Sequence, residues 1–123
     1  MITCVVIDDD KNIVKVFSDI LSLMGLDVLA HGYDGNDAVE LYMKYRPEIL
    51  FTDITMPKYD GFYGIAKIKE FDPDAKIVAV TADVSSKTEQ RLNEFDITAV
   101  LYKPFDIQKI KQVLTQKCKI NLK

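Results

Sequence analysis

Residues 3–10 read TCVVIDDD, a short run of mostly β-branched and apolar side chains followed at once by three aspartates. An apolar run of this length is typical of a strand in a parallel sheet, where both faces of the strand are covered. Ligands of open parallel sheets bind beyond the carboxyl ends of the strands. This stretch therefore predicts a fold class and also indicates where its chemistry lies.

The same alternation of strand and helix continues along the rest of the chain. Apolar runs at 26–30, 48–52, 76–80 and 97–101 predict four more strands. Apolar side chains at helical spacing predict helices around 13–24, 38–45, 65–68, 86–95 and 107–114. Strands alternating with helices favour an α/β fold, a doubly wound parallel sheet with helices on both faces. Tyr42 and Tyr45 are expected in the core, and His31 in a loop after the second strand.

Composition sets the limits on size and class. The chain has 123 residues, 48% of them hydrophobic, and a formal net charge of −3, which fits one domain with its own core. No apolar run is long enough to span a membrane and no leader is recognisable, so we expect a cytoplasmic protein. The acidic balance argues against direct nucleic-acid binding. A single histidine and two distant cysteines exclude multi-histidine metal sites and zinc ribbons.

The charge is unevenly distributed along the chain. Residues 103–123 contain six lysines and one acid, Asp106. Such a basic segment is either a solvated helix face or a docking surface for an acidic partner.

Polar side chains follow four of the five predicted strands. Asp8, Asp9 and Asp10 follow the first, and single residues follow the third, fourth and fifth, namely Asp53, Thr81 and Lys103. If the strands lie in the order 2-1-3-4-5, these four strands are neighbours and their ends converge on one crevice. Each residue alone has an ordinary explanation, and Asp10 is expected to cap the first helix, but the joint arrangement indicates a site.

The chemistry of that crevice follows from its charges. Carboxylates held close together must bind protons or cations, and a site with only oxygen ligands suits Mg²⁺, with Mn²⁺ as an alternative. The ammonium of Lys103 and the hydroxyl of Thr81 suit the oxygens of a phosphoryl group. A carboxylate beside them can attack phosphorus and form an acyl phosphate.

At these residues the chain resembles the response-regulator receiver domain, the CheY-like phosphoacceptor module of two-component signalling. The matching segments are 5–9 (VVIDD), 53–61 (DITMPKYDG), 80–82 (VTA) and 103–105 (KPF), in this order. The resemblance implies a single (βα)5 domain over 1–123, with its core at about 3–117, strand order 2-1-3-4-5 and flavodoxin-like topology. No output domain is expected.

The resemblance also implies roles for individual residues. Asp53 is the phosphorylated aspartate, and Thr81 and Lys103 hold phosphoryl oxygens, with Lys103 paired to Asp53 at rest. The implied Mg²⁺ ligands are Asp9, Asp53 and the backbone carbonyl of Thr55, while Asp8 acts largely through a metal-bound water. The Lys103–Pro104 peptide bond is expected to be cis. Gly61 is expected to shape the loop after the acceptor through a tight turn.

A function follows from the same resemblance. A sensor histidine kinase or a histidine phosphotransfer protein supplies the phosphoryl group. Phosphorylation then switches the surface formed by the helix at 86–95, the strand at 97–101 and the last helix, which controls a partner protein or a homodimer. The domain is a switch rather than an enzyme, although it assists its own phosphorylation and dephosphorylation.

Two features bear on how the switch works. The family commonly places an aromatic residue three positions before the lysine, where this chain has Val100, so the coupling of Thr81 to the surface is expected to be non-aromatic or weakened. Thr55 and Asp83 occupy the positions that tune phosphoryl lifetime in the family, and both could also be plain exposed loop residues.

Three other functions are considered. A haloacid-dehalogenase-like phosphatase also uses an aspartate and Mg²⁺, but its motif requires Thr or Val where this chain has Asn12. A flavodoxin-like cofactor binder would have to place a phosphate against three aspartates. A receiver-like interaction module that is never phosphorylated would not need all five key side chains.

Overall fold

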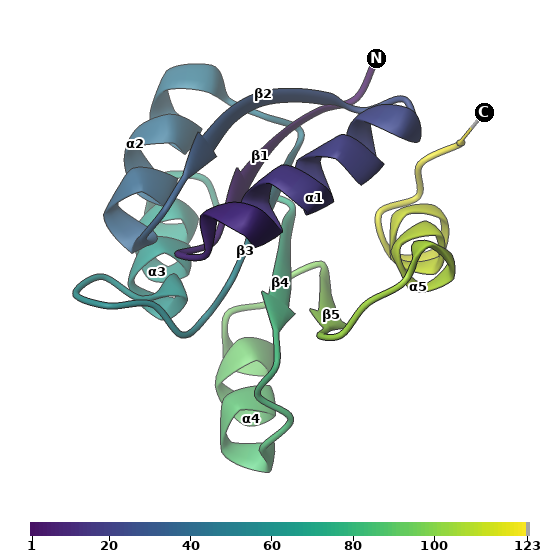
Figure 1. Ribbon diagram of the computed structural model, residues 1–123. Coiled ribbons are helices and arrows are strands. Elements are labelled where there is room, and N and C mark those ends of the chain that lie inside the picture. The colour runs from purple at the N-terminus through teal and green to yellow at the C-terminus, as the bar shows by residue number, and fades with distance from the viewer. Residues whose placement is uncertain (123) are drawn as a thin grey trace.

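The computed structural model describes residues 1–122, and within them five strands alternate with five α-helices (Figure 1). The strands are β1 (Thr3–Ile7), β2 (Asp27–Gly32), β3 (Ile49–Thr52), β4 (Ile77–Thr81) and β5 (Ala99–Tyr102). The helices are α1 (Lys11–Leu23), α2 (Gly35–Tyr45), α3 (Gly61–Phe71), α4 (Ser86–Glu94) and α5 (Ile107–Gln112), and α5 continues into a π-helical turn, η1 (Val113–Lys117). The predicted α/β class and element order are confirmed.

The five strands form one parallel sheet in the order β2-β1-β3-β4-β5, as the resemblance implies. The register aligns the strand ends, since Ile7 of β1 lies opposite Thr52 of β3 and Thr81 of β4 lies opposite Tyr102 of β5. The residues that follow β1, β3, β4 and β5 therefore emerge along one edge of the sheet.

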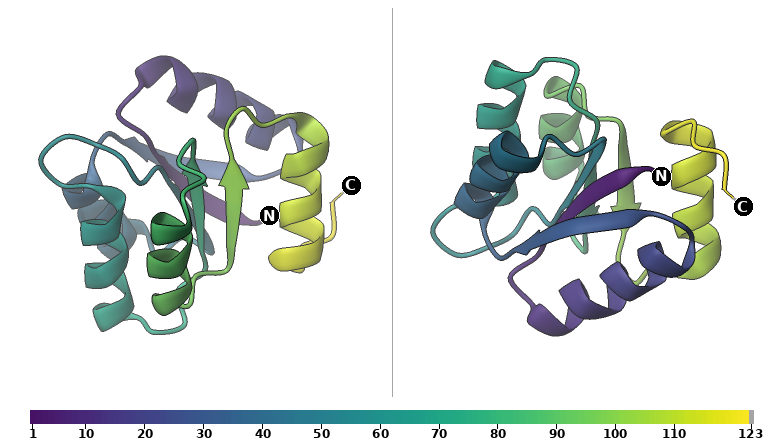
Figure 2. Two further views of the ribbon diagram at one scale, coloured as in Figure 1. Left: turned by 90° about the horizontal axis from the view of Figure 1, so that it is seen from below. Right: turned by 90° about the horizontal axis from the view of Figure 1, so that it is seen from above.

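The core has two layers, one on each face of the sheet (Figure 2). Helices α1 and α5 cover one face, and α2, α3 and α4 cover the other. Because successive side chains of a strand point to opposite faces, Cys4 and Val6 of β1 enter the α1/α5 layer, whereas Val5 and Ile7 enter the other. Both faces are buried, so the inner strands read as continuous apolar runs.

Each α-helix begins at a side-chain cap that satisfies free backbone N–H groups. The Asp10 carboxylate accepts from the N–H groups of Asn12 and Ile13 at the start of α1, which confirms the predicted cap. The other caps are Asp34, Asp60, Ser85 and Asp106. Of the three aspartates after β1, only Asp8 and Asp9 are left for a site.

Two expectations about single residues need correction. His31 lies on β2 rather than in a loop, because β2 pairs with β1 as far as Gly32. Tyr42 is buried and donates its hydroxyl to Asp72 at 2.7 Å, but Tyr45, at the end of α2, is 38% exposed. A residue on an edge strand or at a helix end has fewer neighbours than one in the middle of the fold. The pattern of apolar residues alone therefore predicts the ends of such elements poorly.

Beyond Lys103, the lysines of the basic segment are exposed where the structure describes them. The side chains of Lys109, Lys111 and Lys117 lie on the surface of α5 and η1, and none of them forms an ion pair within residues 1–122. This fits a solvated helix face. Lys123, the last lysine of the segment, lies outside the described residues.

Within residues 1–122, none of the helices combines the length and the apolar character needed to cross a bilayer.

Candidate functional site

Three carboxylates meet beyond the ends of β1 and β3. One oxygen from each of Asp8, Asp9 and Asp53 lies within 4.8 Å of the others. Asp8 and Asp53 are only 3% and 6% exposed, whereas Asp9 lies at the exposed rim. This acidic cluster brings together the residues that the sequence predicts to share a crevice.

Lys103 reaches the acidic cluster from the end of β5. Its Nζ lies 2.7 Å from Oδ2 of Asp8 and 3.4 Å from Oδ2 of Asp53. The lysine therefore bridges both carboxylates and lies closer to Asp8, whereas the family resemblance implied a pairing with Asp53. Its backbone N–H donates to the carbonyl of Thr81 at 2.8 Å, and the following bond to Pro104 is cis.

Backbone hydrogen bonds orient the two buried carboxylates. Oδ1 of Asp8 accepts from the N–H of Asp10 at 3.0 Å, and Oδ1 of Asp53 accepts from the N–H of Ile54 at 2.7 Å. The N–H of Asp53 itself donates to the carbonyl of Ile7 at 2.9 Å. The ladder between β1 and β3 thus fixes Asp53, and its Oδ2 faces Lys103.

The cluster shifts the protonation of its own members. Burial, together with the negative charge of Asp8, raises the pKa of Asp53 above its usual value, against the opposing effects of Lys103 and the Ile54 N–H. Loss of water contact and the charge of Asp8 likewise raise the pKa of Asp9. Burial alone would lower the pKa of Lys103, but the hydrogen bond that Lys103 donates to Asp8 and the charges of Asp53 and Asp8 raise it.

These residues fit a hard divalent cation. Three carboxylates with one ammonium leave an excess of negative charge in a largely buried site, and a cation would offset the repulsion that raises the pKa of Asp53. The donors are oxygens only, with an open side at Asp9, which suits Mg²⁺ with part of its water shell. The carbonyl of Thr55 remains a predicted fourth ligand.

Gly61 supports the acceptor through a close backbone approach. Its N–H donates to the carbonyl of Ile54 at 2.9 Å, and a Cβ at this position would overlap the backbone oxygen of Asp53. The loop needs glycine here because the start of α3 presses against the acceptor loop. A tight turn, as the sequence suggested, is not the reason.

The remaining predicted residues lie around the cluster. Thr81 is buried at the end of β4, and its hydroxyl oxygen accepts from the N–H of Asp83 at 3.0 Å. Val100 is half-buried on the α4 side of β5. Thr55 is exposed in the loop after Asp53. Sequence reasoning missed the hydrogen bonds of Asp83, because the type of residue there does not show which partners the loop brings to it.

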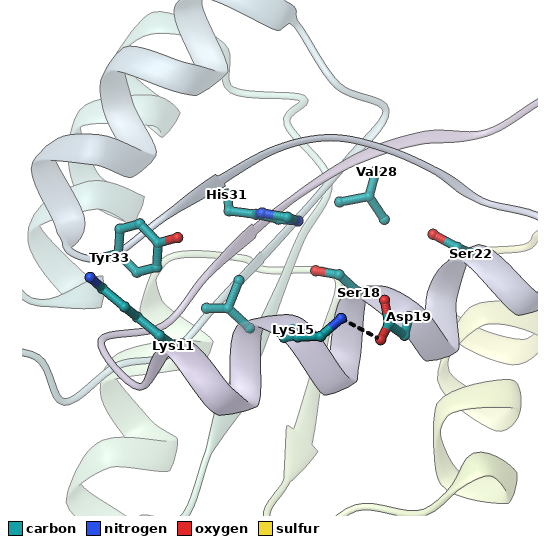
Figure 3. Close-up of a pocket in the computed structure, with 9 residues that line it drawn as sticks. Lys11, Lys15, Ser18, Asp19, Ser22, Val28, His31 and Tyr33 are labelled. Atoms are coloured by element: carbon teal, nitrogen blue, oxygen red, sulfur yellow. Dashed lines mark hydrogen bonds and ion pairs between the residues drawn. The ribbon is translucent and has the colours of Figure 1, made fainter.

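Two hollows in the surface differ in their relation to the cluster. One, of about 370 Å³, has an apolar lining beside Lys103 that is made by Ile13, Ala82, Pro104 and Phe105. Another, of about 440 Å³, lies between α1 and the edge strand β2, with His31, Ser18 and Lys15 around it (Figure 3). None of the three clustered aspartates lines the second hollow. His31 therefore belongs to a different surface from the acidic cluster.

Replacing Asp53 by Asn is expected to stabilise the Mg²⁺-free protein at pH 7. A carboxyl whose folded-state pKa is raised contributes stability at low pH, and this contribution is lost as pH rises through the raised pKa. The advantage of Asp53→Asn should therefore shrink as pH falls towards 3.8, the usual pKa of the group. Urea unfolding of both proteins in EDTA across this pH range measures the difference.

A matched control for this experiment is Asp74→Asn, which removes an exposed carboxyl after α3. Because that carboxyl is exposed to solvent, Asp74→Asn should not reproduce the stabilisation at pH 7 that is expected of Asp53→Asn. A wild type that is as stable as Asp53→Asn at pH 7 would contradict the electrostatic account of the cluster.

Comparison with known proteins agrees with this geometry. The family model of the response regulator receiver domain matches residues 4–115. The chemotaxis protein CheY of Treponema pallidum is 34% identical over 107 residues, which cover 85% of this chain and 74% of that protein. A probable C4-dicarboxylate response regulator, DctR of Halalkalibacterium halodurans, is 31% identical over 94% of this chain, but the match spans only 51% of that longer protein.

A solved structure is similar over almost the whole chain. A chain in the crystal structure of the CheX–CheY–BeF3–Mg²⁺ complex from Borrelia burgdorferi superposes with a TM-score of 0.91 at 25% identity. The match covers 98% of this chain and 90% of that one. None of these similarities is to a haloacid-dehalogenase-like phosphatase. The family match, the strand order and the acidic cluster agree, and the chain belongs to the response regulator receiver domain family.

Proposed function

We propose that Asp53 accepts a phosphoryl group from a phosphohistidine of a sensor kinase or a histidine phosphotransfer protein. The observation that carries this proposal is the placement of Asp53. It is a buried carboxylate held by a backbone N–H, with a second carboxylate and the Lys103 ammonium at its free oxygen. The acceptor carboxylate of a receiver domain must be nucleophilic, and positive charge must surround it when the phosphoryl group approaches.

The transfer step uses the residues of this chain in distinct roles. An oxygen of Asp53 forms a bond to phosphorus while the phosphorus–nitrogen bond of the donor breaks, and the electron pair returns to the donor imidazole. Lys103 lies close enough to neutralise charge that develops on a phosphoryl oxygen. The Thr81 hydroxyl donates to another oxygen of the bound group. Asp53 thereby becomes an acyl phosphate.

The acidic cluster is the proposed cation site for this reaction. Asp8, Asp9, Asp53 and the carbonyl of Thr55 would hold Mg²⁺, or Mn²⁺ in its place, which supplies positive charge to the phosphoryl oxygens. The superposed Borrelia complex contains Mg²⁺ and BeF3, which supports a receiver fold of this kind holding such a cation.

The donor protein needs a surface beside the acceptor, and the apolar hollow at Lys103 offers one. Ile13 of α1 and the segment Pro104–Phe105 after β5 line it, and Phe105 is braced by Phe17 with ring centroids 4.9 Å apart. An apolar side chain of a donor helix could pack there while its phosphohistidine faces Asp53.

The output of the domain is proposed to be a change in the α4–β5–α5 surface. Thr81 links the acceptor to this surface, because it lies at the end of β4 directly before the loop to α4. Val100 fills the position that in the family commonly carries an aromatic ring. The change in the surface therefore depends on contacts other than those of a moving ring. A partner protein or a second copy of the chain would read this surface.

The phosphoryl group is also proposed to be removed with help from the domain itself. Thr55 is exposed and Asp83 is half-exposed, so both can influence the water that approaches the acyl phosphate. The domain is a signalling switch that assists both reactions rather than an enzyme acting on other molecules.

The proposal is tested with acetyl phosphate as donor, followed by acid quench and intact-mass measurement. The wild type is expected to gain one phosphoryl group in Mg²⁺ and none in EDTA, because the cluster must be neutralised before an anion enters. Asp53→Asn should gain none, and Asp74→Asn should behave as the wild type. Phosphorylation of Asp53→Asn at the wild-type rate would refute the assignment of the acceptor.

A further inference from the structure

A chain of hydrogen bonds runs from the Thr81 hydroxyl to the first turn of α4 through one residue, Asp83. The N–H of Asp83 donates to Oγ1 of Thr81 at 3.0 Å. Its carboxylate accepts from the N–H of Ser85 at 2.8 Å and from the hydroxyl of Thr88 at 2.6 Å. Asp83 therefore holds the end of β4 with its backbone and the start of α4 with its side chain.

Both threonines that this series of hydrogen bonds connects are shielded from water. Thr81 is 1% exposed and Thr88 is 8% exposed, although both are polar. Hydrogen bonds to a charged acceptor are the stronger ones, and those from Thr88 and Ser85 lower the pKa of Asp83. The link therefore joins two buried threonines through one ionised carboxylate.

Helix α4 has few other attachments to the sheet. Its buried residues are Thr88 and Leu92, and the guanidinium of Arg91 stacks on Phe62 of α3 with its carbon 3.8 Å from the ring centroid. Val100 is a small side chain and packs only partly into the same layer. The polar link at the first turn is therefore a large share of what ties α4 to the end of β4.

We propose that Asp83 is a positioning residue that transmits the engagement of the Thr81 hydroxyl to α4, in place of an aromatic ring at Val100. This inference rests on the proposed phosphorylation of Asp53. A hydroxyl accepts and donates at once, so Thr81 can donate its proton to a phosphoryl oxygen while it keeps the bond from Asp83. When the hydroxyl turns towards Asp53, Asp83 moves with it and pulls on Ser85 and Thr88.

The test measures hydrogen exchange of the amides in α4 with and without beryllofluoride and Mg²⁺. Loading of Asp53 is followed separately through the ¹⁹F signals of bound beryllofluoride. In the wild type, loading is expected to change the exchange rates of α4 by about three- to tenfold, which corresponds to the net effect of an ordinary intramolecular hydrogen bond. Thr88→Val keeps the shape of the side chain but removes the donor, and should lose most of this change while still loading Asp53.

Thr88→Ser is the matched control, because it restores the hydroxyl and should restore the response of α4. Asp83→Ala removes the carboxylate but keeps the backbone N–H, and should lose the response as Thr88→Val does. A purely structural role for Thr88 would alter exchange equally in the free and loaded states, so the ratio between the two states would not move.

The outcomes separate this inference from the proposed function. If the wild type and both disrupting variants load Asp53 and α4 responds equally in all three, Asp83 does not transmit the signal. If the wild type loads and α4 does not respond, the inference also fails, while the phosphoacceptor role stands. If the wild type does not load at all, the proposed function fails, and the inference with it.

Discussion

Replacing Lys103 by Gln is expected to slow phosphorylation of Asp53 by about 10²–10³-fold, the usual cost of removing one positioned donor from a developing anion. Lys103 is the ammonium that bridges Asp8 and Asp53, at 2.7 Å and 3.4 Å. Without Lys103, the negative charge of the carboxylates is less well neutralised, and it repels the incoming phosphoryl oxygens. The measurement is the initial rate of phosphorylation by acetyl phosphate in saturating Mg²⁺, followed by intact mass.

Two further variants make this result specific. Lys109→Gln removes the same charge from an exposed position on α5 and should leave the rate unchanged. Lys103→Arg keeps the charge but replaces a flexible ammonium with a wide planar group, and should recover only part of the rate. A Lys103→Gln protein that reacts as fast as the wild type would remove the lysine from the mechanism.

The second large effect is on stability. Gly61→Ala is expected to lower the free energy of unfolding by about 3 kcal/mol or more, because the new Cβ overlaps backbone atoms that cannot easily move. Those atoms are the Asp53 oxygen and Cα of Ile54. For a domain of this size the melting temperature should fall by about 10 °C or more. Thermal and urea unfolding both measure the change.

Gly25→Ala provides the comparison for this variant. Gly25 has φ +97° and open space around its Cβ position, so an alanine there meets only the backbone cost of about 1–2 kcal/mol. Gly61→Ala should be clearly the more destabilised of the two. If the two variants have the same melting temperature, close approach of α3 to the acceptor loop is not what requires glycine at position 61.

The fold could be predicted from the sequence to a large extent, because its inner strands are buried on both faces. The run at 3–7 coincides with β1 at both ends. Edges were harder. His31 belongs to β2 because its backbone pairs with that of Val6. Such backbone pairing cannot be recognised from the types of the exposed side chains. Similarly, Ile107 follows the apolar spacing of the last helix, yet it is 53% exposed.

The composition of the site was predictable, but its pairings were not. Asp8, Asp9 and Asp53 were expected in one crevice, and they form one cluster. The closer partner of Lys103 is Asp8, 95 residues away in the sequence, because the register of β1 and the path after β5 set that distance. The link from Thr81 through Asp83 to Thr88 depends in the same way on loop geometry that residue types do not determine.

The central claim is that Asp53 is the residue that carries the phosphoryl group. The most direct measurement is peptide mapping of the wild-type protein after reaction with acetyl phosphate and Mg²⁺, with reduction of the acyl phosphate to mark its position. We predict that the mark lies on Asp53 alone. A mark on Asp8 or Asp9, or on no aspartate of the cluster, would contradict this assignment.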